Sequence, residues 1–395
     1  MKRDKLGPAS LAIVVMTIAL LVACVLAAGL AGAQVRDPLE VQKGRDVKLQ
    51  KRGSVSYYSE RWDLSGLPAY EPGQKVSGVI RQRGTNYFAD SPLEKTWEEG
   101  FRKFHPGVRF ETDLETALAA IPSLTFKLAD VGPSRHITSD ETLLFQRYRS
   151  YLPTEITVVT GSLNVPGWSY AIGIFVNKDN PLAQLTAEQL DGIFGAERSG
   201  AFQGTEWKTD AARGPEKNIR TWGQLGLHGE WANKPIDVYG YNLKYHIPTT
   251  LADRVMQGGA KWNEKLKEFT NYKNADGTTE LEGKQVMDAV SRDKYGIGFS
   301  GIGFLTPQAK AVDIAARGST RYVALNLQNL RSRAYPLYDE VYFYLDRAPG
   351  KPLDPKVREY LRYILSREGQ DAVQRDGKYL PLTAEVVREQ LKKLD

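Results

Sequence analysis

The sequence predicts an α/β protein in which helices cover mostly parallel sheets. Three observations support this fold class. Short apolar strands alternate with helical segments along the body of the chain. Residues 170–176 are almost wholly apolar, as in a strand that is buried on both faces. The first two predicted strands are each followed by a helix, which favours parallel pairing through crossover connections.

The first 33 residues have the pattern of an export leader and lie outside the predicted fold. Basic residues precede an apolar run over 11–30, and residues 31–33 match a small-residue cleavage site. Cys24, the only cysteine, ends a Leu-Val-Ala-Cys sequence that matches a lipobox. Three fates stay open: cleavage after Ala33, lipidation at Cys24, or retention as a membrane anchor. All three predict a protein exported to the periplasm or cell envelope.

Composition and motif content argue against several functional classes. The formal net charge of +6 is mild for 395 residues and favours anionic ligands only slightly. No basic run with interleaved aromatic residues is present, so no nucleic-acid partner is expected. The four histidines lack metal-ligand spacing. Nucleophile-elbow, Walker and paired-carboxylate motifs are absent, so we expect neither a cofactor nor an enzyme.

The glycine pattern Gly296-Ile-Gly-Phe-Ser-Gly301 matches the dinucleotide-binding fingerprint in its letters alone. It lies in a predicted strand that follows a helix. The fingerprint requires the turn from a strand into a helix. We therefore expect these glycines to allow close backbone packing, and Ser300 to face a cleft.

The body of the chain is predicted to begin near Val76, after a polar extension over 34–75. The expected order of its first elements is a strand at 76–80, a helix around Leu93 to Phe104, a strand at 108–111, a helix at 115–120, and strands at 127–131 and 155–160. Residues 161–167 would then cross into a second lobe, and residues 334–338 would return. A strand at 341–345 and two C-terminal helices complete the predicted first lobe.

Residues 170–194 read as a buried strand, a tight turn and a capped helix. Residues 177–181 are dense in turn formers, and Pro181 cannot continue a central strand. Thr186 and Gln189 form a capping box flanked by Leu185 and Leu190 at the hydrophobic-staple positions. This unit resembles the start of the second lobe in periplasmic substrate-binding proteins.

Several later segments extend the resemblance to the phosphate-binding proteins of bacterial phosphate ABC transporters, in the order in which that family has them. They are 185–194, 221–225, 235–239, 295–299 and 364–373. The resemblance implies a type II periplasmic binding protein fold with two lobes joined by two crossing segments. It implies that residues 76–165 plus 336–395 form lobe 1 and residues 166–335 form lobe 2.

The family binds its anion with backbone amides at helix N-termini and with short hydroxyl side chains. The resemblance places two such sites in lobe 1: the turn Arg83-Gly84-Thr85-Asn86, and Ser134 with Arg135. Alternative interpretations stay open, because Thr85 and Asn86 could simply cap the following helix, and Arg135 could be a solvated surface residue.

The third expected ligand loop, 240–250, departs from the family pattern. The phosphate binders carry an Arg-Ser-Asp-Gly-Ser-Gly-Thr type of loop, and this chain lacks that Arg and both later glycines. Tyr241 and Asn242 begin the loop, and Tyr241 could equally be a packing residue. Thr249 and Thr250 could offer hydroxyls, with Thr249 as helix cap. Lys244 or His246 could replace the missing positive charge.

The leading hypothesis is a monomeric, extracytoplasmic solute-binding protein that captures an anion, with phosphate expected, for the membrane permease of an ABC transporter. The altered third loop motivates an alternative, in which the same fold acts as an envelope sensor or scaffold without transport. A third hypothesis is an exported hydrolase of phosphate esters.

Overall fold

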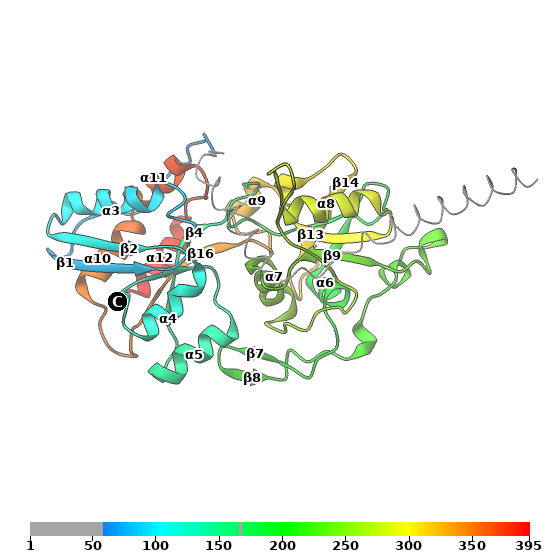
Figure 1. Ribbon diagram of the computed structural model, residues 1–395, viewed down its shortest axis with the longest axis horizontal. Coiled ribbons are helices and arrows are strands. Elements are labelled where there is room, and N and C mark those ends of the chain that lie inside the picture. The colour runs from blue at the N-terminus through cyan, green and yellow to red at the C-terminus, as the bar shows by residue number, and fades with distance from the viewer. Residues whose placement is uncertain (1–57, 166–167) are drawn as a thin grey trace, which may run out of the picture.

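The computed structural model describes residues 58–165 and 168–395. The predicted leader and most of the extension lie outside the described residues. Figure 1 shows two lobes side by side, each built around its own sheet, with chain segments passing between them. Within the described residues, no helix combines the length and apolar character needed to cross a bilayer.

Lobe 1 contains a mixed sheet. Strands β1 (Gly78–Arg83) and β2 (Val108–Asp113) pair in parallel, and α3 (Leu93–Phe104) connects them as predicted. Strands β3 (Gly132–Ser134) and β4 (Thr154–Thr160) are both antiparallel to β16 (Glu340–Leu345). A parallel bridge between Gln82 and Val131 joins β1 to the segment that leads into β3.

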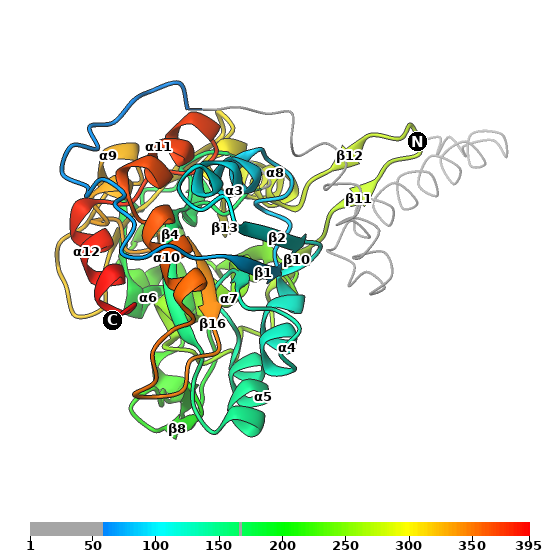
Figure 2. The ribbon, with the colours of Figure 1, turned by 90° about the vertical axis from the view of Figure 1, so that its left-hand side faces the viewer.

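The return strand β16 is buried on both faces and separates the two cores of lobe 1. Val341, Phe343 and Leu345 pack into the core under α3, α10 (Pro355–Ile364), α11 (Arg367–Asp376) and α12 (Ala384–Lys392). Tyr342 and Tyr344 point to the opposite face, against α4 (Ala120–Thr125) and α5 (Ser139–Arg149). This alternation follows from the two-residue period of a strand. Figure 2 shows α10 and α12 on one side of these strands and α4 and α5 on the other.

Lobe 2 contains a five-stranded sheet in the order β10 (Lys267–Phe269), β9 (Asp237–Tyr241), β13 (Gly296–Ser300), β5 (Gly173–Asn177), β14 (Ala309–Ala311). β9 is parallel to both of its neighbours, and β5 is antiparallel to both of its neighbours. Helix α8 (Glu282–Arg292) packs on this sheet, and α6 (Ala187–Phe194) packs against α7 (His246–Met256). Apolar side chains from all of these helices join one core.

The other described elements are short. The strands are β6 (Gln184–Thr186), β7 (Ala201–Gln203), β8 (Glu206–Lys208), β11 (Tyr272–Lys273), β12 (Thr279–Glu280) and β15 (Asp313–Ala315), and the remaining α-helix is α9 (Leu327–Arg331). The 3₁₀ helices are η2 (Ala117–Ala119), η3 (Pro215–Lys217), η4 (Trp222–Leu225), η5 (Gly229–Trp231) and η6 (Ile302–Phe304).

The strand–turn–helix unit at 170–194 is confirmed. The amide of Gln189 donates to Thr186 Oγ1 at 3.2 Å, and the amide of Thr186 donates to Gln189 Oε1 at 2.9 Å, which completes the capping box. Leu185 and Leu190 are fully buried, and the helix ends at Gly195. Local sequence was sufficient here because capping, turn and burial signals all agree.

Three predicted elements are shifted. The helix expected at 115–120 is a 3₁₀ turn at Ala117–Ala119 that continues into α4. The third strand is Gly132–Ser134, just beyond the predicted 127–131. Helix α7 begins at His246, so the prediction that Thr249 caps it was wrong. Pro248 lies in the first turn of α7, where a proline leaves no intrahelical hydrogen bond unmade.

The two crossing segments run side by side. The amide of Gly161 donates to the carbonyl of Asp339 at 2.8 Å, and the amide of Ile172 donates to the carbonyl of Leu337 at 2.9 Å. The Tyr335 hydroxyl also donates to the Ile172 carbonyl at 2.8 Å. Backbone pairing therefore couples the outgoing chain to the returning chain.

The described end of the extension packs on lobe 1. The amide of Trp62 donates to Gln374 Oε1 at 2.9 Å. The Tyr70 hydroxyl donates to Glu359 Oε2 at 2.9 Å. Residues 58–74 are thus part of the folded body, anchored on α10 and α11.

Candidate functional site

The N-terminus of α7 faces the loop after β1. Tyr87, from that loop in lobe 1, places its hydroxyl oxygen 2.9 Å from Nδ1 of His246, the first residue of α7 in lobe 2. No side chain caps the N-terminus of α7. The first amides of a helix have no intrahelical acceptor and carry partial positive charge. The contact between the lobes at this helix end is therefore suited to an anion.

A buried aspartate lies behind His246. Asp339 Oδ2 is 3.4 Å from His246 Nε2, and Thr250 Oγ1 donates to Asp339 Oδ1 at 3.5 Å. Asp339 is 1% exposed, and its Oδ2 has no hydrogen-bond partner within the described chain. Asp339 belongs to the returning crossing segment, so the imidazole lies between lobe 1 and the crossing.

Neither Tyr87 nor Asp339 was predicted from the sequence as a site residue. One signal could have identified Asp339, since Asp339 and Glu340 are two consecutive acids at the start of an otherwise apolar strand. Tyr87 follows the predicted ligand turn directly, but an aromatic residue beside a turn is too common to indicate a site. Long-range folding brings both side chains to His246.

The first predicted turn packs against the neighbouring strand, and its side chains contact protein groups. A Cβ at position 84 would lie 1.9 Å from the Pro133 carbonyl oxygen, so Gly84 is needed for close packing on the neighbouring strand. Arg83 is exposed and pairs with Asp113 at 2.8 Å. Thr85 is buried, and its Oγ1 accepts the Tyr87 amide at 3.4 Å.

The interpretation of Thr85 and Asn86 as caps of the next helix was wrong. Helix α3 begins after Pro92 with no side-chain cap, and the amide of Leu93 instead takes Ser91 Oγ as acceptor at 3.2 Å. Asn86 donates to Asp90 at 2.7 Å within its own loop. The two side chains therefore shape the loop that carries Tyr87.

The second predicted site is buried and internally paired. Ser134 is fully buried, and its hydroxyl donates to the Ala117 carbonyl at 3.3 Å. Arg135 is 8% exposed, and its Nη1 lies 2.8 Å from Glu141 Oε2. Arg135 is thus not the solvated surface residue of the alternative interpretation, and its charge is already balanced.

The third loop divides into residues that face the cleft and residues that do not. His246 and Thr250 meet Asp339, as described above. Tyr241 is fully buried in lobe 2, where its hydroxyl lies 2.8 Å from that of Tyr170 and 2.9 Å from Ser300 Oγ. Ser300, expected to face a cleft, takes part in this buried hydroxyl chain.

The remaining loop residues support the turn before α7. Asn242 is buried, and its Oδ1 accepts the Lys244 amide at 3.1 Å. The Lys244 side chain is exposed. Thr249 is partly buried inside α7. Of the two candidates for the missing arginine charge, His246 is the one that contacts Tyr87 of lobe 1 and Asp339 of the crossing segment.

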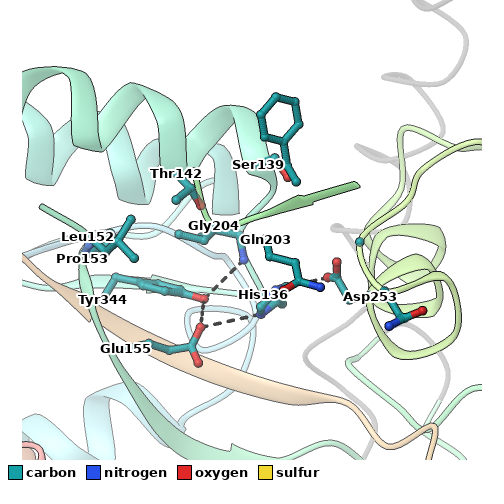
Figure 3. A pocket seen from close by; sticks show the side chains of 14 residues that line it. His136, Ser139, Thr142, Leu152, Pro153, Glu155, Gln203, Gly204, Asp253 and Tyr344 are labelled. Carbon is teal, nitrogen blue, oxygen red and sulfur yellow. Dashed lines mark hydrogen bonds and ion pairs between the residues drawn. The ribbon is translucent and has the colours of Figure 1, made fainter. Parts of the chain in front are cut away.

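A second contact joins the lobes farther along α7. His136, which follows β3, places Nε2 3.2 Å from Asp253 Oδ2 on α7 and Nδ1 3.7 Å from Glu155 Oε2 on β4. Figure 3 shows His136 between the two carboxylates, on the wall of a cavity of about 470 Å³. The Tyr344 hydroxyl donates to Glu155 at 2.5 Å.

The environment of this second contact shifts three pKa values. Burial disfavours charged imidazole, but the carboxylates of Glu155 and Asp253 outweigh it and raise the pKa of His136. Burial raises the pKa of Asp253, although His136 opposes that change. Burial likewise favours neutral Glu155, but hydrogen bonds from His136 and Tyr344 lower its pKa overall. The two carboxylates thus favour the charged form of His136.

Metal binding finds no support in this part of the chain. Across residues 58–165 and 168–395, no group of three or more His, Cys, Asp or Glu side chains has the arrangement to hold a metal ion. The contacts between the lobes are made by hydroxyl, imidazole and carboxylate groups.

Comparison with known proteins agrees with this architecture. A family model described as a PBP superfamily domain matches residues 74–368. The phosphate-binding protein PstS of Pseudomonas aeruginosa strain PAO1 is 32% identical over 330 residues, covering 83% of this chain and 90% of that protein. Protein SphX of Synechococcus elongatus is 25% identical over 219 residues, 54% of each chain.

Two solved structures are similar to this chain at low sequence identity. An ABC-type phosphate transport receptor from Vibrio cholerae has 16% identity and a TM-score of 0.48, covering 76% of this chain and 99% of that one. PstS from Borrelia burgdorferi has 13% identity and a TM-score of 0.49, covering 78% and 100%. The family match and the PstS relative confirm the fold class and the resemblance inferred from sequence. The chain belongs to the PBP superfamily, with its superfamily domain at residues 74–368.

Proposed function

We propose that this protein binds phosphate in the cleft between its lobes, outside the cytoplasm, and delivers it to the permease of an ABC transporter. The observation that carries the proposal is the contact between Tyr87 and His246, which brings lobe 1 onto the uncapped N-terminus of α7. The name of the Pseudomonas aeruginosa relative, a phosphate-binding protein, supports the same ligand. The protein acts by binding and release rather than by catalysis.

Closure of two lobes is the proposed mechanism. The lobes are residues 76–165 with 336–395, and residues 166–335, and they turn about the paired crossing segments. A ligand that touches both lobes binds the closed form more tightly and shifts the equilibrium towards it. The closed monomer then docks on the permease. The leader, whether it is then cleaved, lipidated at Cys24 or retained, directs the protein to the outer side of the membrane.

Asp339 provides a physical reason for phosphate over sulfate. Its buried Oδ2 can accept a hydrogen bond but cannot donate one while ionised. Phosphate at neutral pH carries a proton that it can donate to this oxygen. Sulfate carries none, and it would face the carboxylate with repulsion. His246 and the α7 amides supply the donors for the other oxygens.

Isothermal titration of the purified protein with phosphate and sulfate tests the proposal. We expect one phosphate per cleft and at least tenfold weaker binding of sulfate, and the His246→Ala variant should lose most of the phosphate affinity. Absence of heat with phosphate, together with no shift in thermal unfolding, would contradict the proposal.

One observation favours a second candidate function, that of an envelope sensor or scaffold without transport. Arg135 is already paired with Glu141, and Lys244 is exposed, so the lost loop arginine has no full replacement in the cleft. Phosphate uptake by cells that lack the protein separates the two functions. Uptake that stays unchanged while an envelope response is lost would favour the sensor.

A further inference from the structure

Lobe 2 contains a cavity of about 620 Å³ near the opposite end of α7 from His246. Arginines converge there on one aspartate of α6, Asp191, which is 2% exposed. Arg198 binds it through both oxygens, at 2.8 and 2.7 Å. Arg213 Nε lies 3.2 Å from Oδ1, and Arg317 Nη2 lies 3.3 Å from Oδ2. All four residues line the cavity.

The buried charges of this arginine cluster do not balance. Three guanidinium groups share a single buried carboxylate. Two of them also donate to carbonyls at the C-terminus of α7, Arg198 to Met256 and Arg317 to Val255. Those carbonyls carry only partial negative charge. Arg317 is 33% exposed and its Nη1 also lies 4.0 Å from Oε1 of the exposed Glu188, so the buried excess is one guanidinium, Arg198 and Arg213 against Asp191. Because buried charges normally occur in balanced pairs, this excess points to an anion that is not part of the protein.

Arg213 is the clearest sign of a missing partner. The residue is only 6% exposed, and its Nη1 donates to Asn218 Oδ1 at 2.8 Å. Its Nη2 finds no acceptor anywhere in residues 58–165 or 168–395. Burial lowers the pKa of Arg213, and the neighbouring Arg198 and Arg220 reinforce the effect against Asp191. An anionic oxygen near Nη2 would satisfy both the donor and the charge.

The rim of the cavity is acidic, in contrast to the arginines at its floor. Asp210 and Glu216 line it and are exposed. Carboxylates accept hydrogen bonds from hydroxyl groups and repel additional negative charge. The cavity volume leaves room for an organic portion beyond the anionic group.

We propose that this cavity is a second binding site, for a small hydroxylated organic anion such as a sugar phosphate or sugar acid. The phosphate or carboxylate binds Arg213 and Arg317 at the floor, and the hydroxyl groups bind Asp210 and Glu216 at the rim. The proposal does not depend on phosphate binding in the cleft.

Titration with glucose 6-phosphate and gluconate, with glucose as the uncharged probe, tests the site. We expect wild-type protein to bind at least one of the two anions and not glucose. Arg213→Gln should weaken that binding by tenfold or more. Lys217→Gln, which removes an exposed charge from the same rim, should change it less than twofold. His246→Ala should leave it unchanged.

Arg317→Gln provides a second variant if Arg213→Gln does not fold. The Arg317 side chain is 33% exposed, and its removal leaves the two-oxygen contact of Arg198 with Asp191 in place. It too should weaken binding. Binding of neither anion to wild-type protein would overturn the proposal, as would binding that His246→Ala abolishes and the arginine variants leave intact.

Discussion

Tyr87 and His246 meet across the cleft, with the Tyr87 hydroxyl oxygen 2.9 Å from Nδ1 and the two rings edge to face at 5.6 Å. The other ring nitrogen of His246 faces Asp339 at 3.4 Å. One imidazole therefore contacts lobe 1 on one side and the returning crossing segment on the other. Its position depends on the angle between the lobes.

Tyr87→Phe should weaken phosphate binding by about three- to tenfold, because it removes one hydrogen bond worth roughly 0.5–1.5 kcal/mol from the closed form. Titration calorimetry measures the change. Tyr148→Phe is the matched control, since Tyr148 is 54% exposed on α5. Equal affinity of wild type and Tyr87→Phe would show that the contact does not contribute to closure.

His246→Ala should weaken phosphate binding by tenfold or more, since a charge-assisted hydrogen bond is worth roughly 1.5–3 kcal/mol. Lys244→Ala should change the affinity less than twofold, because the Lys244 side chain is exposed. The two substituted residues lie in the same loop, and both variants are titrated under the same conditions. A larger loss in Lys244→Ala than in His246→Ala would assign the missing arginine charge to the lysine.

Asp339→Asn should reduce the preference for phosphate over sulfate. The amide keeps the shape of the side chain but adds a donor, so a fully deprotonated oxyanion is no longer repelled. We expect sulfate affinity to rise and phosphate affinity to fall, so that their ratio drops by about tenfold or more, or roughly 1.4 kcal/mol. An unchanged ratio in competition titrations would exclude Asp339 from selectivity.

The contact of His136 with Asp253 should make stability depend on pH. The pKa of His136 is raised in the folded protein, so its contribution is fully present below the ordinary value of about 6.5 and is lost as pH rises through the raised value. At low pH the contact fails for a different reason, because burial raises the pKa of Asp253 and favours its neutral form. The contribution is therefore largest between these two titrations.

Thermal unfolding of wild type and His136→Gln measures this contribution. The side chain is 39% exposed, so solvent screening limits the effect to roughly 0.5–1 kcal/mol, or about 1–3 °C, near pH 6. The difference should shrink as pH rises through the raised pKa of His136. His228→Gln, which changes an exposed histidine, is the control. A difference that grows with pH would contradict the assignment.

The sequence predicted those secondary-structure elements that local patterns determine. The capping box of Thr186 and Gln189 and the parallel pair of β1 and β2 appear in the structure. Strand β9 and helix α7 follow in the expected order, although α7 begins earlier than its Thr249 suggested. Hydrophobic periodicity and turn-forming residues act within a few residues of the chain, so they can be recognised without knowing the tertiary contacts.

The candidate site was only partly predictable because its chemistry arises from long-range contacts. His246 was identified, but its partners Tyr87 and Asp339 are 159 and 93 positions away along the chain. From the sequence, Arg135 and Lys244 were both candidate cationic ligand residues, in the second and third predicted sites. The structure separates them by surroundings, since one is buried against Glu141 and the other is exposed.

The location of Asp339 also has a mechanical consequence. Its backbone carbonyl accepts the Gly161 amide between the crossing segments, while its carboxylate faces His246. The residue proposed to contact the solute is thus close to the hinge between the lobes. A rotation of a few degrees there produces its largest displacement at the far tips, where Figure 1 places α5 and the β7–β8 hairpin next to each other. In the proposed closure, a small rotation near the solute therefore gives a large movement at the lobe tips.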